Sequence, residues 1–216
     1  HDDLPAMDND DLRRGVPTNH KVYGEAMGVL SGVALLNYAY EVMFTAFDLG
    51  KDEKSQARII KALKIMSHKT GIYGMLGGQV IDVKETGHAV SKDVLDTIYE
   101  LKTGALIEAS MMIGAILGGA SQEEVKTVER IASLVGLAFQ VQDDILDVIS
   151  TQEELGKPIH SDEKNEKTTY VTLLGIDDAK KVVEEKSEEA ISLLRTLPNE
   201  NPYLEELLME LIHRKK

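Results

Sequence analysis

Residues 121–149 have the sequence SQEEVKTVERIASLVGLAFQVQDDILDVI and hold the strongest structural signal in the chain. Ser121 and Glu124 have the three-residue spacing of a capping box, in which each side chain hydrogen-bonds the backbone N–H group of the other residue. Apolar residues then recur three and four positions apart, and they occupy too many faces for a helix that lies on a surface. The stretch therefore predicts a buried helix at the centre of a helical domain.

The rest of the chain shows the same helical period. No stretch keeps the alternating period of a β-strand for long, and the 216 residues contain no visible repeat or linker. We expect further helices over residues 23–48, 53–68, 74–84, 91–117, 169–174, 177–197 and 202–213. The prediction is an all-α fold, a single-domain helical bundle that covers residues 1–216.

The helix predicted over residues 23–48 has two unusual features. Gly24, Gly28 and Gly32 lie four residues apart on one face, although each glycine weakens a helix interior by about 1 kcal/mol. Their alignment predicts a groove in which another backbone comes close. The other faces are strongly apolar, so we expect this helix also to be central and buried.

Composition excludes several classes of function. Hydrophobic residues make up 43% of the chain, and the net charge of −13 opposes nonspecific binding to nucleic acid or anionic lipid. The absence of cysteine excludes disulfides and cysteine-ligated metals and fits a reducing compartment, so we expect a cytoplasmic protein. No segment approaches ~18 uncharged apolar residues, so we expect no membrane span. An anionic ligand would have to be held by local cations or by metal ions.

Three aspartates interrupt the apolar helix predicted over residues 121–149. At 100° per residue, Asp143 and Asp147 lie ~40° apart, and Asp144 falls within the same ~100° arc. Carboxylates on one face repel one another, and hard divalent cations with oxygen ligands relieve that repulsion. One such cluster arises readily by coincidence in an acidic chain, so by itself it only suggests a metal site.

A second acidic cluster strengthens this interpretation. Asp2, Asp3 and Asp8 are followed at once by the pair Arg13–Arg14. Pro5 makes an unbroken helix unfavourable here, so we expect a local bulge that brings the aspartates together. Carboxylates for Mg²⁺ and arginines for phosphate then stand side by side, which is the combination that a metal-bound phosphate ligand requires.

These residues resemble the motifs of the trans-isoprenyl diphosphate synthases. Residues 2–15 resemble the first aspartate-rich motif of that family, and residues 139–147 resemble the second. Between them, Lys102-Thr103 resembles a lysine–threonine signature, and Gly77-Gly78-Gln79 with Asp82 matches a further pattern. The resemblance covers essentially the whole chain and implies the helical bundle of that family, with a central cavity between the two aspartate-rich motifs.

The resemblance also implies a reaction. Family members join isopentenyl diphosphate to an allylic diphosphate: the allylic C–O bond ionises, the alkene attacks the cation, and a proton is lost. About three Mg²⁺ ions, with Mn²⁺ as a substitute, would stabilise the leaving diphosphate. We expect a homodimer that joins isopentenyl diphosphate to dimethylallyl or geranyl diphosphate and makes farnesyl diphosphate.

Individual roles follow from the same match. The metal ligands would be Asp2, Asp3, Asp8, Asp143, Asp144 and Asp147, with Asp2, Asp8 and Asp143 making most contacts. Arg13, Lys102, Lys157 and Lys167 would hold the allylic diphosphate, and Arg14 the isopentenyl diphosphate. Thr103 and Gln140 would face the allylic cation, so that the implied catalytic residues are Lys102, Thr103 and Gln140. The polar segment 153–168 has the composition of a lid that excludes water.

The chain also departs from the family pattern. Val16, Val33 and His160 stand where other residues are usual, which affects ligand affinity and lid movement more than reaction type. The upstream helices that set product length and help to bind isopentenyl diphosphate are absent, so we expect a truncated chain that turns over poorly. Geranylgeranyl diphosphate synthase, a terpene cyclase and a non-catalytic subunit remain as alternatives. The intact second motif argues against a cyclase, and both acidic clusters argue against a non-catalytic role.

Overall fold

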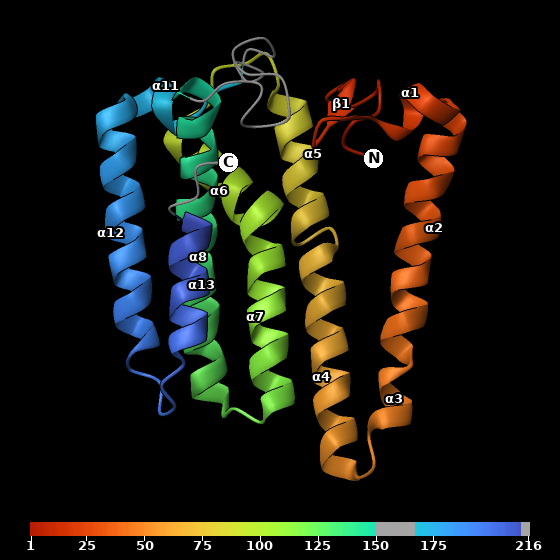
Figure 1. Cartoon of the computed structure of the whole chain (residues 1–216), viewed down its shortest axis with the longest axis vertical. Coiled ribbons are helices and arrows are strands. Elements are labelled where there is room, and N and C mark those ends of the chain that lie inside the picture. The colour runs from red at the N-terminus through yellow and green to blue at the C-terminus, as the bar shows by residue number, and fades with distance from the viewer. Residues whose placement is uncertain (150–166, 213–216) are drawn as a thin grey trace. The chain divides into compact units, whose positions relative to one another are not determined.

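The computed structural model describes residues 1–149 and 167–212 (Figure 1). Its elements, in chain order, are β1 (Leu12–Arg13), β2 (Val16–Pro17), α1 (Asn19–Tyr23), α2 (Glu25–Phe44), α3 (Ala46–Leu49), α4 (Glu53–Thr70), α5 (Met75–Glu85), α6 (Lys92–Tyr99), the π-helix η1 (Glu100–Gly104), α7 (Ala105–Gly118), α8 (Gln122–Ile149), α11 (Tyr170–Leu174), α12 (Ile176–Leu194) and α13 (Pro202–Ile212). The predicted all-α class is confirmed for the described residues. The predicted lid, with Lys157 and His160, lies almost entirely outside them.

The described residues pack as two compact units. The first consists of residues 1–56, and the second of residues 57–149 together with residues 167–212. Each is described below by itself. The extent of the domain, 1–216, stays a prediction.

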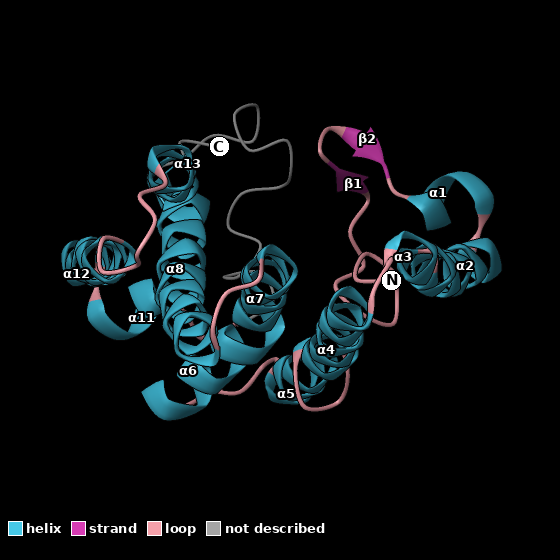
Figure 2. Cartoon of the chain, turned by 90° about the horizontal axis from the view of Figure 1, so that it is seen from below, coloured by secondary structure: helices cyan, strands magenta, loops and turns pink. Residues whose placement is uncertain are grey.

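Helix α8 is the central element of the second unit. It packs against α7 and α12, with further contacts to η1 and α13 (Figure 2). Ile131, Val135 and Ala138 on α8 are fully buried. At its start, the Ser121 N–H group donates to the Glu124 carboxylate, and the Glu124 N–H group donates to Ser121 Oγ at 3.3 Å. The buried helix and its capping box are both confirmed.

The single helix expected over residues 91–117 is divided by the π-helix η1. An ideal Cβ on Gly78 of α5 would lie 2.3 Å from the Lys102 backbone nitrogen, and one on Gly136 of α8 would lie 2.8 Å from Gly104 Cα. Two helices therefore approach the η1 backbone at positions where only glycine fits. The period of apolar residues did not reveal this change, because a π turn alters the helix only locally.

The first unit contains a small hairpin that the sequence analysis missed. Strands β1 and β2 pair antiparallel, with Leu12 opposite Pro17 and Arg13 opposite Val16. The two linking residues, Arg14 and Gly15, have φ angles of 52° and 78°. Positive φ at both positions is typical of a type I′ turn. Strands of two residues are too short to show an alternating pattern.

The structure confirms only part of the helix expected over residues 23–48. Gly24, with φ 87°, separates α1 from α2, and Thr45 separates α2 from α3. The glycine face does allow a close approach, but by side chains of the N-terminal segment and not by another helix backbone. Leu4 lies against Gly28 and His1 against Gly32, where His1 Nε2 hydrogen-bonds the Val29 carbonyl at 2.9 Å.

The first unit by itself does not bury this helix, contrary to the expectation. Within α2, which is described in full, Gly28 alone is buried, and Leu35 and Leu36 are 69% and 57% exposed. The composition of a helix shows how many faces are apolar, but only tertiary contacts decide which of them are covered.

Two stretches of the described residues reach the length and mean hydropathy of a membrane span, namely Glu25–Leu49 and Lys92–Gly118. The core helix of a globular protein meets the same criterion, and the second stretch is partly buried within the fold. The expectation that no segment spans a membrane stays a prediction.

We predict that Gly136→Ala destabilises the protein by about 1–3 kcal/mol, because the new methyl group would collide with the Gly104 backbone. Gly114→Ala in α7 is the matched control. Nothing lies within 4 Å of the added Cβ there, so this variant should be neutral or up to about 1 kcal/mol more stable. Urea denaturation of both variants measures the difference. Equal free energies of unfolding would contradict the close packing of α8 on η1.

Candidate active site

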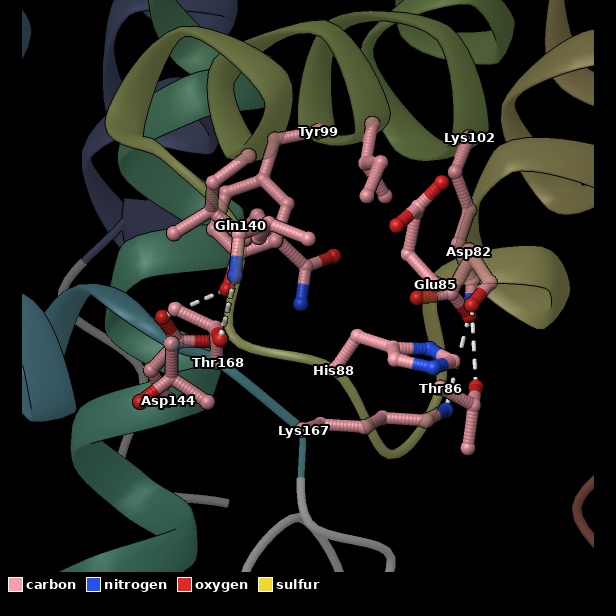
Figure 3. Close-up of a pocket in the computed structure, with 14 residues that line it drawn as sticks. Asp82, Glu85, Thr86, His88, Tyr99, Lys102, Gln140, Asp144, Lys167 and Thr168 are labelled. Atoms are coloured by element: carbon pink, nitrogen blue, oxygen red, sulfur yellow. Dashed lines mark hydrogen bonds and ion pairs between the residues drawn. The ribbon is translucent and has the colours of Figure 1, made fainter.

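A pocket in the second unit is formed by α5, α6, η1, α8 and the segment before α11 (Figure 3). Its charged and polar lining residues are Asp82, Glu85, Thr86, His88, Tyr99, Lys102, Gln140, Asp144, Lys167, Thr168 and Thr169. Four of the predicted site residues therefore line one cavity: Lys102, Gln140, Asp144 and Lys167. The lining combines two cations with several carboxylates and hydroxyl groups.

Two lysines converge on one carboxylate in this pocket. Asp82 Oδ2 lies 2.7 Å from Lys102 Nζ and 3.4 Å from Lys167 Nζ. Burial alone would raise the pKa of Asp82, but the two ammonium groups outweigh that effect and lower it. Asp82 is thus ionised at neutral pH, and the three groups together carry one net positive charge.

The predicted pair Thr103 and Gln140 is in direct contact. Thr103 Oγ1 donates to Gln140 Oε1 at 2.7 Å, which joins η1 to α8. The hydrogen bond orients the Gln140 amide, and Gln140 lines the pocket. Lys102 and Thr103 are neighbours in η1, but their side chains bond to different helices. Lys102 reaches Asp82 of α5, and Thr103 reaches Gln140 of α8.

Asp144 of the second acidic cluster is held by the protein itself. Its Oδ2 atom accepts hydrogen bonds from Tyr99 Oη at 2.7 Å and from the Tyr170 N–H group at 2.8 Å. The side chain is buried, and the rings of Tyr99 and Tyr170 stack with centroids 5.7 Å apart. The carboxylate therefore satisfies a backbone N–H group in the first turn of α11, which has no partner within its own helix.

Tyr170 continues this network towards the surface. Burial, followed by the hydrogen bond to Asp96, raises the pKa of Tyr170 to about 12, so its hydroxyl group stays protonated and donates to Asp96. Lys92 Nζ lies 2.7 Å from Asp96 Oδ2 and 3.0 Å from Tyr170 Oη. The network joins α6, α8 and α11 on one side of the pocket.

The other two aspartates of the second motif differ in burial. Asp143 is half-buried, whereas Asp147 is 3% exposed, and Asp147 Oδ1 has no hydrogen-bond partner among the described residues. A buried carboxylate oxygen without a donor is costly unless a cation approaches it. The residue thus fits a metal ion. No group of three or more His, Asp or Glu residues is arranged to hold a metal within residues 1–149 and 167–212.

The first unit carries the other acidic cluster. The predicted bulge is confirmed, since the Asp8 N–H group donates to the Asp2 carbonyl at 3.0 Å across a non-helical loop. Arg13 on β1 pairs with Asp3 at 2.6 Å, and Arg14 lies exposed in the hairpin turn. Arg13 and a carboxylate of this cluster are therefore side by side, as expected.

Sequence reasoning gave no role to Asp82 and Tyr99, which line the pocket, or to Tyr170, which contacts the pocket residue Asp144. Asp82 was predicted only as part of a family pattern. Tyr99 lies three residues before Lys102, a helical spacing that puts both on one face. Asp82 carries no comparable signal, because nothing in its neighbourhood shows that two distant lysines approach it.

The fold and the pocket define a class: an all-helical protein with two aspartate-rich motifs, one of which lies beside a lysine-lined cavity. The comparisons with known proteins identify the family. A model of the polyprenyl synthetase family matches residues 1–208, and the chain belongs to this family.

Individual relatives show the same relationship. The chain is 48% identical over 191 residues to the chloroplastic geranylgeranyl pyrophosphate synthase of Capsicum annuum, a match that covers 88% of this chain and 51% of the relative. It is 43% identical over 180 residues to the farnesyl diphosphate synthase of Geobacillus stearothermophilus, covering 83% and 60%. The chain spans about half to three-fifths of these relatives.

A solved structure agrees with the fold. The geranyltransferase of Helicobacter pylori, complexed with magnesium and isoprenyl diphosphate, matches with a TM-score of 0.85 and 36% identity. The match covers 98% of this chain and 68% of that one.

We predict that Tyr99→Phe lowers the free energy of unfolding by about 1.5–3 kcal/mol, the usual loss for a hydrogen bond to a charged group. The loss should be large because Asp144 is buried, and in the variant its Oδ2 atom no longer receives the hydrogen bond from Tyr99. Tyr203→Phe removes the same hydroxyl group from a residue that is 75% exposed and should change little. Thermal unfolding of the two variants compares them, and equal midpoints would argue against the Tyr99–Asp144 bond.

Proposed function

We propose that this chain belongs to a Mg²⁺-dependent short-chain prenyl diphosphate synthase, which joins isopentenyl diphosphate to an allylic diphosphate. The observation that carries this proposal is the pair of lysines, Lys102 and Lys167, that converge in a pocket beside Gln140 and Asp144. Two preorganised ammonium groups suit a polyanionic leaving group. Membership of the polyprenyl synthetase family supports the same reaction.

The residues of the pocket divide into two roles. Lys102 and Lys167 hold the diphosphate of the allylic substrate, and they stabilise the charge that develops on it as the C–O bond breaks. Thr103 and Gln140 present oxygen dipoles to the allylic cation, with the Gln140 amide oriented by its bond to Thr103. In the first unit, Arg13 contributes to the allylic diphosphate site and Arg14 to the isopentenyl diphosphate site. Lys157 lies outside the described residues, and its predicted role in holding the allylic diphosphate stays a prediction.

The carboxylates fit the binding of magnesium. Asp143 and Asp147 supply ligands from α8, and the Oδ1 atom of Asp147, which has no hydrogen-bond partner within residues 1–149 and 167–212, supports this assignment. Asp144 contributes indirectly, because its Oδ2 atom already accepts two hydrogen bonds. Asp2, Asp3 and Asp8 supply ligands from the first motif. When bound, Mg²⁺ supplies Lewis-acid stabilisation of the diphosphate.

Two products are compatible with the proposed reaction. We propose farnesyl diphosphate, and the 48% identity to a geranylgeranyl pyrophosphate synthase favours geranylgeranyl diphosphate as the second candidate. Incubation with isopentenyl diphosphate and each allylic diphosphate, followed by chromatography of the products, distinguishes the two. Absence of any prenyl product from the full-length protein would reject both.

We predict that Lys102→Ala in the full-length protein lowers turnover by about 10²-fold, because one preorganised positive charge is lost from the leaving-group site. Lys180→Ala, on the exposed face of α12, serves as the control and should keep nearly full turnover. Steady-state kinetics at saturating substrate measures both. Similar small effects at the two positions would remove Lys102 from the catalytic residues.

We further predict that diphosphate binding requires Mg²⁺, because a site that contains so many carboxylates repels a polyanion unless cations intervene. Calorimetry with an allylic diphosphate should show binding with Mg²⁺ and at least a hundredfold weaker binding in EDTA. Equal affinity under the two conditions would reject the role of the metal.

A further inference from the structure

Asp82 has no role in the reaction as proposed, yet it lies at the centre of the lysine pair. Its carboxylate comes from α5, Lys102 from η1, and Lys167 from the segment before α11 (Figure 3). The three side chains are only 15%, 25% and 14% exposed. Three separate elements thus bring their charges together in a largely water-poor place.

The backbone of α5 holds Lys102 at a second point. Gly78 lies one helical turn before Asp82, on the same face of α5. It packs directly against the Lys102 backbone, because an ideal Cβ on Gly78 would lie 2.3 Å from the Lys102 nitrogen. One face of α5 therefore fixes the main chain of Lys102 through Gly78 and its ammonium group through Asp82. Lys102 has little freedom to turn away from the pocket.

The contact leaves the lysines able to bind a ligand. Each ammonium group has three N–H donors, so a bond to Asp82 does not prevent the same group from also donating to a phosphate oxygen. A diphosphate group can therefore meet both lysines while Asp82 keeps its place. It then also meets the negative charge of Asp82, which the two lysines keep ionised, as shown by the lowered pKa.

We propose that Asp82 is a built-in counter-ion that positions Lys102 and Lys167 and limits how tightly the pocket holds diphosphate, so that inorganic diphosphate leaves after each turnover. This inference rests on the proposed function of the pocket. Without Asp82, two nearby ammonium groups would bind a polyanion more tightly but release it more slowly. Asp82 is thus a positioning residue that also sets the affinity of the site.

Calorimetry of inorganic diphosphate with excess Mg²⁺ tests the proposal. Asp82→Asn should bind about tenfold more tightly than the unmodified protein, since one nearby negative charge is removed at low exposure. Asp178→Asn, an exposed position on α12, makes the same change in net charge and should bind as the unmodified protein does. Asp82→Glu keeps the charge and should not gain affinity. Asp82→Ser gives a second neutral variant should the asparagine variant fail to fold.

Kinetics of the full-length protein separates this role from a merely structural one. Asp82→Asn should lower both KM for the allylic diphosphate and kcat, because binding tightens and diphosphate release slows. A merely structural loss would raise KM. The gain in affinity should also shrink in the Lys102→Ala background, since one of the two lysines is then missing.

The outcomes are distinct. Unchanged or weaker diphosphate binding by the neutral Asp82 variants, or an equal gain in Asp178→Asn, would overturn the role of Asp82 while the proposed function stands. Failure of the unmodified protein to bind Mg²⁺-diphosphate would instead reject the proposed function itself.

Discussion

The close approach of α5 and α8 to the π-helix η1 is the constraint on which the pocket depends. Gly78 and Gly136 let two helix backbones reach the segment Glu100–Gly104 from different sides. A side chain at either glycine would push one helix away. Lys102 would then lose its position relative to Asp82, and Thr103 its contact with Gln140. Packing at two glycines therefore determines the geometry of the polar groups several ångströms away.

The polar groups around the pocket fall into two networks with different tasks. Asp144, Tyr99 and Tyr170 form a buried, hydrogen-bonded connection that attaches the start of α11 to α6 and α8. Lys102, Asp82 and Lys167 form a more accessible charged group at the pocket. The first network gives rigidity, because a buried polar network is stable only when its members are satisfied. The second presents two ammonium groups to the pocket.

Buried charge elsewhere in the second unit has a structural explanation. Lys69 of α4 bonds Glu108 of α7 and Glu129 of α8, which ties three helices together. Burial is the largest influence on Glu108 and raises its pKa, although Lys69 opposes that shift. This ion group therefore contributes to the packing of the three helices.

Much of the fold was predictable from local patterns. The capping box at Ser121 and the apolar period of α8 act through neighbours in the sequence, and the bounds of this helix were predicted to within one residue. The hairpin at Arg14–Gly15 was missed because two-residue strands have no period. How little of α2 the first unit covers was not predictable, because an apolar surface does not show what covers it.

The sequence by itself determined the helical class and the two acidic clusters, whereas the catalytic roles of Lys102, Thr103 and Gln140 stay predictions that the family resemblance implies. The helical class and the clusters depend on residue type and on short spacings along the chain, which the sequence carries locally. Only the tertiary structure decided that Asp82 lies between Lys102 and Lys167, and that Asp144 is bound by Tyr99 and the Tyr170 backbone. These contacts join residues 20 to 85 positions apart. Their formation depends on how helices pack, and no local pattern encodes that.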